Sequence, residues 1–182
     1  MKTDITHALI EEHKLILRMI ALLENNARRT AEGNYTTWQF YRDGIDFIRQ
    51  YADRFHHAKE EDVLFTALID NGMPREHSPV AAMLMEHERG RAFVGALEEA
   101  VTEAEAGNRQ AYGRIAENAL GYAALLRDHI AKEDGILYPL AERIVPEAMR
   151  QRIVNGYRDA EAKTPTAPGD HYRRLVEQYE RE

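Results

Sequence analysis

Two copies of the motif HxxxE occupy matching places in the two halves of this 182-residue chain. The first runs from His56 to Glu60, and the second runs from His129 to Glu133, 73 residues later. On an α-helix, residues four positions apart lie one above the other on one face, so this imidazole and carboxylate can bind one metal ion or form one ion pair. A single HxxxE is typical of a solvated ion pair. Repetition in register favours two halves of one site.

Two further histidines repeat with nearly the same offset. His13 and His87 are 74 residues apart, and each directly follows a glutamate, Glu12 or Glu86. Both histidines lie on the apolar stripe of a predicted helix, so we expect their side chains to point inward. Neither has a ligand-type residue four positions later, which leaves an ordinary core role open for each of them. We expect Glu12 and Glu86 at the surface or beside the ligands.

The composition restricts the possible chemistry. Cysteine is absent, which excludes disulfides, zinc–thiolate sites and cysteine-bound iron–sulfur clusters. Imidazole with carboxylate suits iron, with manganese or zinc as poorer fits. The formal net charge of −7 and the lack of a basic patch argue against nucleic-acid binding. Charged residues interrupt the apolar run at 15–17, so we expect no membrane span or signal segment and a cytoplasmic location.

Apolar periodicity predicts the elements that must position these residues. Long helices are expected over about 4–29, 36–71, 79–107 and 108–139. Asp4 is the expected N-cap of the first, Thr36 with Gln39 reads as a capping box, and Ser78 before Pro79 is a strong start signal. The fourth helix should kink or end near Pro139. Short connections predict an all-α fold, an antiparallel up-down-up-down four-helix bundle whose halves are related by a pseudo-twofold.

The C-terminal part is predicted to be a short helical extension. A helix is expected over about 146–157, a proline-containing linker over 163–169, and a last helix over 171–180. We therefore expect residues 1–145 to form the bundle and residues 146–182 to pack on or near it.

Such a bundle would place six polar side chains on its inner seams: His13, His56, Glu60, His87, His129 and Glu133. Burying them without partners would cost on the order of several kcal/mol in total. Two iron ions, bridged by the two glutamates and each bound by two histidines, would satisfy these groups. A bundle whose histidines satisfy one another is an alternative. A ferritin-like oxidase would require Glu-x-x-His on two helices, which does not occur here.

The register of the first motif has a competitor, because His57 and Glu61 show the same spacing one residue later. His57 follows the polar Asp53 by four residues, so we expect it off the seam and solvated, like His7, His77 and His171. Only the helical stripe and the second copy select His56 and Glu60. Tyr122, one to two turns before His129, is either a hydrogen-bond donor to the site or an ordinary core tyrosine.

The order His, HxxxE, His, HxxxE, with its Glu-His pairs and with Leu64-Phe65 and Leu137-Tyr138-Pro139 after the motifs, resembles the hemerythrin-like (HHE cation-binding) domains over about residues 4–142. The resemblance implies a non-haem di-iron centre in which Glu60 and Glu133 bridge the ions together with an oxo or hydroxo group. Oxygen-carrying hemerythrins have another histidine one turn after the third-helix histidine, where this chain has Arg91. The reduced set is similar to that of the repair-of-iron-centres proteins, which often carry a cysteine-containing domain.

What the resemblance implies about function is binding or sensing of a small ligand: oxygen, nitric oxide or peroxide. The alternative is a di-iron enzyme, or a factor that donates iron to centres damaged by oxidative or nitrosative stress. Redox turnover needs an open coordination position and a proton source. The sequence does not separate these hypotheses, and it leaves the protein partner or electron donor unknown.

Overall fold

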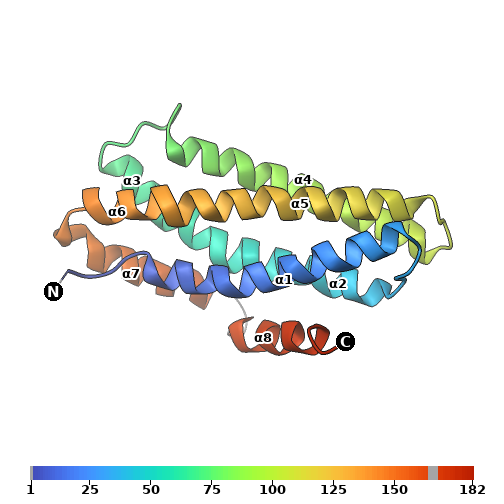
Figure 1. The fold of residues 1–182 in the computed structure, drawn as a ribbon. Helices are drawn as coiled ribbons and strands as arrows, with labels where there is room; N and C mark the ends of the chain where they lie inside the picture. The colour runs from blue at the N-terminus through green and yellow to red at the C-terminus, as the bar shows by residue number, and fades with distance from the viewer. Residues whose placement is uncertain (1, 164–167) are drawn as a thin grey trace.

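The computed structural model describes residues 2–163 and 168–182, and every regular element in these residues is helical (Figure 1). In chain order the elements are α1 (His7–Ala31), α2 (Trp38–Phe47), η1 (Ile48–His57), η2 (Glu60–Phe65), α3 (Thr66–Asp70), α4 (Pro79–Glu105), α5 (Ala111–Lys132), η3 (Glu133–Leu137), α6 (Tyr138–Ile144), α7 (Glu147–Ala162) and α8 (Pro168–Tyr179). The elements labelled η are π-helical.

These elements form four long rods: α1, α2 through α3, α4, and α5 through α6 (Figure 1). Helix α5 packs against both α1 and α4, and α2 packs against α4. The prediction of an all-α helical bundle is confirmed. None of the described helices is both long and apolar enough to cross a membrane.

The starts of the helices agree only in part with the sequence signals. Ser78 caps α4, and its hydroxyl accepts a hydrogen bond from the Ala81 amide at 3.2 Å. Asp4 accepts from the Thr6 and His7 amides at 2.9 and 2.7 Å, as an N-cap side chain does, but the N-cap position of α1 is Thr6 and the helix begins at His7, two residues later than expected. The capping box at Thr36 was wrong: α2 begins at Trp38, and the Gln39 side chain donates to Asp43.

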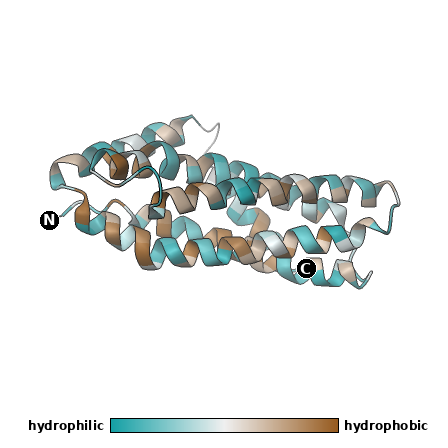
Figure 2. Ribbon diagram, turned by 90° about the horizontal axis from the view of Figure 1, so that it is seen from above, coloured by the Kyte–Doolittle hydropathy of each residue, from teal (hydrophilic) through white to brown (hydrophobic). Residues whose placement is uncertain are grey.

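Two apolar clusters lie at different heights of the bundle, and each rod carries its buried histidine between them. On α1, Leu9 belongs to one cluster and Ile16 to the other, with His13 between. In the other three rods His56, His87 and His129 also lie between the two clusters, with the order along the chain reversed in the second and fourth rods. Apolar residues recur among hydrophilic ones along the helices (Figure 2). The fold therefore encloses one polar layer between two apolar layers, which shields that layer from water.

The π-helical segments coincide with parts of the two HxxxE motifs. Segment η1 ends at His57, η2 begins at Glu60, and η3 begins at Glu133. A π-helix bonds residue i to i+5, so each such turn shifts the residues that follow around the helix axis, and such turns occur frequently at functional sites. Near Pro139, where a kink or an end was predicted, η3 changes to α6, and the rod continues to Ile144.

The C-terminal helices lie against the bundle. Helix α7 packs on η2, and α8 packs on α1 and η1. The guanidinium of Arg150 is fully buried and donates to the Thr3 carbonyl at 2.6 Å, while the Tyr157 hydroxyl donates to the Ile5 carbonyl at 2.9 Å. Helix α7 is longer than predicted, and most of the predicted 163–169 linker lies outside the described residues.

Candidate metal centre

Four histidines, one from each rod, meet as two pairs in the polar layer. His13 of α1 faces His56 of η1 with 3.0 Å between their Nε2 atoms, and His87 of α4 faces His129 of α5 with 3.1 Å between theirs. All four side chains are buried. The structure thus brings together all four histidines that the sequence selected.

Glu60 and Glu133 are fully buried between these pairs. Oxygens of Glu133 lie 3.3 Å from Nε2 of His13 and 3.1 Å from Nε2 of His129. An oxygen of Glu60 lies 3.8 Å from Nε2 of His56 and 3.5 Å from Nε2 of His87. Each carboxylate therefore reaches one histidine of each pair, the arrangement that a carboxylate shared by two ions requires.

An outer carboxylate fixes the far nitrogen of each imidazole. The Nδ1 contacts are His13 to Asp134 at 2.8 Å, His56 to Glu12 at 2.8 Å, His87 to Glu61 at 2.6 Å, and His129 to Glu86 at 3.0 Å. Metal-binding histidines commonly donate Nδ1–H to a carboxylate, which sets the tautomer and orients Nε2 toward the ion. Glu12 and Glu86 thus lie beside the candidate ligands, each holding a histidine of a neighbouring rod.

The outer contacts follow the internal repeat. Glu12 also pairs with Lys59, and Glu86 pairs with Lys132 at the matching position of the second half. The two lysines differ in environment, because the Lys59 side chain is fully buried and that of Lys132 is 41% exposed. Lys59 also contacts Glu161 of α7 at 2.9 Å and lies over the Phe55 ring. Helix α7 therefore contacts the lysine of the first half, Lys59, and makes the surroundings of the two related lysines unequal.

The buried carboxylates have oxygens that no hydrogen-bond donor satisfies. Within the described residues, Glu60 Oε2 and both oxygens of Glu133 lack a hydrogen-bond partner. Burial and the neighbouring Glu133 charge raise the pKa of Glu60 well above its ordinary value. Burial lowers the pKa of His56 well below its ordinary value, which favours the neutral imidazole that binds metals. The donor set and these unsatisfied oxygens fit metal ions.

His57 corrects one expectation from the sequence. It is not solvated: the residue is only 7% exposed, and its ring stacks on that of His87 with 3.8 Å between centroids. The π-helical turns of η1 explain the difference, because an outward position for His57 follows only from a 3.6-residue repeat. Ligand-type atoms of His57, Glu60, His87 and His129 lie within 4.8 Å of one another, as do those of His13, His56, Glu60 and Glu133. His7, His77 and His171 are exposed, as expected.

Tyr138 is a further site residue that the sequence analysis did not select. Its hydroxyl donates to Glu60 Oε1 at 2.5 Å, and its ring stacks on His13. The available signal was a substitution between the repeats, since Phe65 occupies the matching position in the first half. Tyr122 is buried, and its hydroxyl has no hydrogen-bond partner among the described residues.

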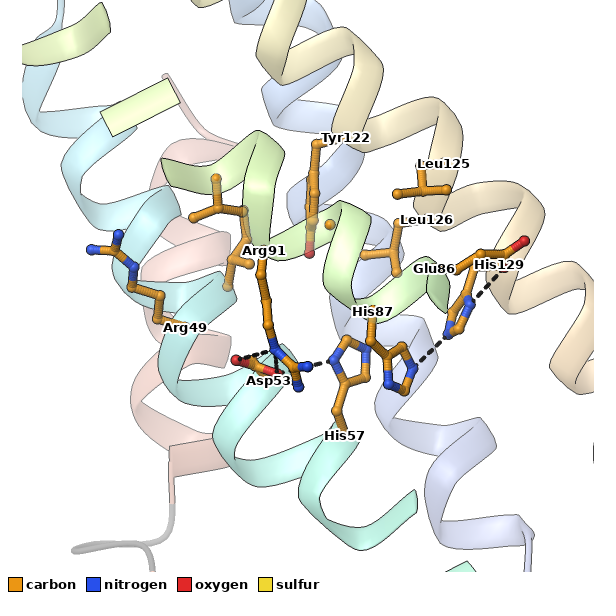
Figure 3. A pocket seen from close by; sticks show the side chains of 13 residues that line it. Arg49, Asp53, His57, Glu86, His87, Arg91, Tyr122, Leu125, Leu126 and His129 are labelled. Carbon is orange, nitrogen blue, oxygen red and sulfur yellow. Dashed lines mark hydrogen bonds and ion pairs between the residues drawn. The ribbon is translucent and has the colours of Figure 1, made fainter. Parts of the chain in front are cut away.

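A cavity of about 240 Å³ adjoins one of the two histidine pairs. Figure 3 shows His57, His87 and His129 on its lining together with Tyr122 and Leu126. Arg91 of α4 also lines this cavity, and its Nη2 contacts Asp53 at 2.6 Å and Glu61 at 2.8 Å. The His13–His56 pair does not line this cavity.

The helical bundle and its buried histidine–carboxylate layer define a cation-binding four-helix-bundle protein. The hemerythrin HHE cation binding domain matches residues 4–141, and the chain belongs to this family. It is also similar to uncharacterized protein Rv1995 of Mycobacterium tuberculosis and uncharacterized protein Mb2018 of Mycobacterium bovis, each 22% identical over 153 residues. The match covers 84% of this chain and 59% of each relative, so the chain spans less than two thirds of their length. No solved structure matches it.

Proposed function

We propose that this protein is a non-haem di-iron protein that binds or senses oxygen, nitric oxide or peroxide. The proposed ligands include His13, His56, Glu60, His87, His129 and Glu133. The observation that carries the proposal is the placement of Glu60 and Glu133, each of which reaches one histidine of each pair while three of their four oxygens lack hydrogen-bond donors.

The chemistry of the donors supports iron. A site of imidazole and carboxylate without cysteine suits iron better than metals that prefer thiolate. When bound, two iron ions would supply one-electron redox steps and coordination positions for a small ligand. Glu60 and Glu133 would help to hold both ions, because each reaches one histidine of each pair.

The chain's own residues prepare the site for this role. The outer carboxylates hold each imidazole in one orientation, so little rearrangement is needed when a metal binds. The apolar layers above and below exclude water, which strengthens electrostatic interactions within the layer. The cavity beside His57 provides space for a diatomic molecule or peroxide. We also propose that residues 1–145 form the metal-binding unit and that the helical extension 146–182 covers one of its sides.

A second candidate is an enzyme or an iron-donating repair factor. The observation that favours it is the hydroxyl of Tyr138, which donates a hydrogen bond to the buried carboxylate of Glu60. A hydroxyl at that place can pass a proton to the carboxylate, and reduction of peroxide to water, or of nitric oxide to nitrous oxide and water, consumes one proton for each electron that the reduced iron ions would supply. A purely ligand-binding protein does not need this transfer.

Metal analysis after anaerobic iron loading tests the proposal. We expect two iron ions per chain in the wild type and fewer than two in Glu133→Ala, because that change removes a carboxylate shared by both ions. Glu117→Ala is the matched control, since Glu117 is exposed on α5. A wild type that retains far less than two metal ions would refute the di-iron assignment.

Stopped-flow spectra of the reduced, loaded protein then separate the two candidates. Oxygen, nitric oxide and peroxide would be mixed in turn with the protein. A stable adduct supports binding or sensing, and repeated consumption of the ligand supports catalysis.

A further inference from the structure

We propose that His57 is an additional metal ligand, so that the two metal positions of this protein are chemically different. One position would be formed by His57, His87 and His129 with the two shared glutamates, Glu60 and Glu133. The other would be formed by His13 and His56 with the two shared glutamates. This inference rests on the proposed dinuclear function.

The environment of His57 follows the rule that the other four buried histidines obey. Each of those has Nδ1 on an outer carboxylate and Nε2 directed into the polar layer. His57 has its Nδ1 3.3 Å from Asp53, and a ligand-type nitrogen of its ring lies within 4.8 Å of ligand-type atoms of Glu60, His87 and His129. A carboxylate on one imidazole nitrogen, with the other left available, is the usual preparation of a histidine for a metal.

Asp53 itself is held in place. The Arg91 guanidinium donates to both of its oxygens, at 3.1 Å to Oδ1 and 3.3 Å to Oδ2 from Nε. Burial raises the pKa of Asp53, but the contacts with His57 and Arg91 outweigh it and hold that pKa well below its ordinary value. Arg91 of α4 thus supports, through Asp53, a histidine supplied from η1.

A simple packing role does not account for His57. Stacking on His87 would be provided equally by an aromatic ring without a carboxylate partner. The position that matches His57 in the second half of the chain is Ile130, a buried apolar residue of the large core cluster. His57 is therefore a nitrogen donor that the second half of the chain lacks. This additional imidazole lines the cavity.

The chemical consequence is a difference in affinity. A further neutral imidazole strengthens a site for borderline divalent metals, so the first ion should occupy the position that contains His57. Loss of an outer partner alone typically lowers metal affinity about 10- to 100-fold. Removal of a direct ligand should weaken the tighter binding step by at least that factor.

Equilibrium titration with Co²⁺ against a competing chelator tests this, because Co²⁺ absorption reports both affinity and the donors around the ion. We expect two distinguishable binding steps in the wild type. His57→Ala should weaken the tighter step about 100-fold or more. Added imidazole should restore this step, because the space left by the His57 ring adjoins the cavity. His7→Ala is the matched control, because it makes the same substitution at an exposed histidine.

Unchanged affinities and spectra in His57→Ala would overturn the proposal. Should circular dichroism show that this variant does not fold, Asp53→Asn provides the second test: the tighter step should weaken about 10-fold, and an unchanged step would again overturn it. A wild type that binds no metal would refute the dinuclear function itself, which distinguishes that failure from an unimportant His57.

Discussion

Replacing Tyr138 by phenylalanine tests whether the polar layer is built for a metal. The substitution removes one buried hydroxyl, the donor to Glu60 Oε1 at 2.5 Å, and leaves the ring that stacks on His13. Glu60 Oε2 already lacks a partner, so both oxygens of a fully buried carboxyl group would then be unsatisfied. An unsatisfied buried acceptor costs about 1–3 kcal/mol. We expect the metal-free protein to lose about this much unfolding free energy.

The same substitution should cost less when metal is bound, because an ion on Glu60 compensates the carboxylate directly. Urea unfolding of the metal-free and metal-loaded forms measures the difference. Tyr157→Phe is the control, since its hydroxyl donates to the Ile5 backbone carbonyl rather than to a candidate ligand, and its loss should cost about the same 1–3 kcal/mol in both forms. Equal losses for Tyr138→Phe in both forms would show that no ion contacts Glu60, and the reasoning about the layer would fail.

Three other outcomes are expected. Lys59→Met should lower the unfolding free energy by about 3 kcal/mol, because it removes a fully buried cation from Glu12. Lys132→Met should lower it by less than about 1 kcal/mol, because the Lys132 side chain is 41% exposed. Urea unfolding of the two variants measures both values. Gly156→Ala should destabilise by about 1–3 kcal/mol, since a Cβ would lie 2.8 Å from Val63 Cγ1, and calorimetry should show a lower midpoint temperature. Removal of the metal by a chelator should lower the unfolding free energy by about 2.7 kcal/mol, compared with protein in free metal at 100 times the dissociation constant. Thermal melts with and without chelator measure this difference.

The internal repeat made most of this site predictable. Residues four apart share a helix face at any ordinary helix position, so HxxxE in two copies predicted that the two motifs would contribute to one site inside the bundle. The apolar stripe gave the same answer for His13 and His87. These inferences needed only helical periodicity, which the long rods obey over most of their length.

The remaining features depend on tertiary structure. His57 turns inward through a π-helical segment, whose hydrogen-bond pattern no 3.6-residue periodicity reveals. The pairing of Glu12 with His56 joins two different rods, so it depends on their relative height and rotation. Tyr138 is another example, because its contact with Glu60 crosses from the fourth rod to the second.

The departures from internal symmetry divide the centre into two unlike sides. Phe65 stacks on His87 as Tyr138 stacks on His13, so both rings are conserved in position between the halves, yet only Tyr138 has a hydroxyl for Glu60. That side is also closed by α7 through Lys59. The opposite side has His57 in place of an isoleucine, and the cavity. Two equivalent positions would need neither difference. The tyrosine side therefore supplies a hydrogen bond to the carboxylate between the two positions, and the other side supplies an additional imidazole beside the cavity.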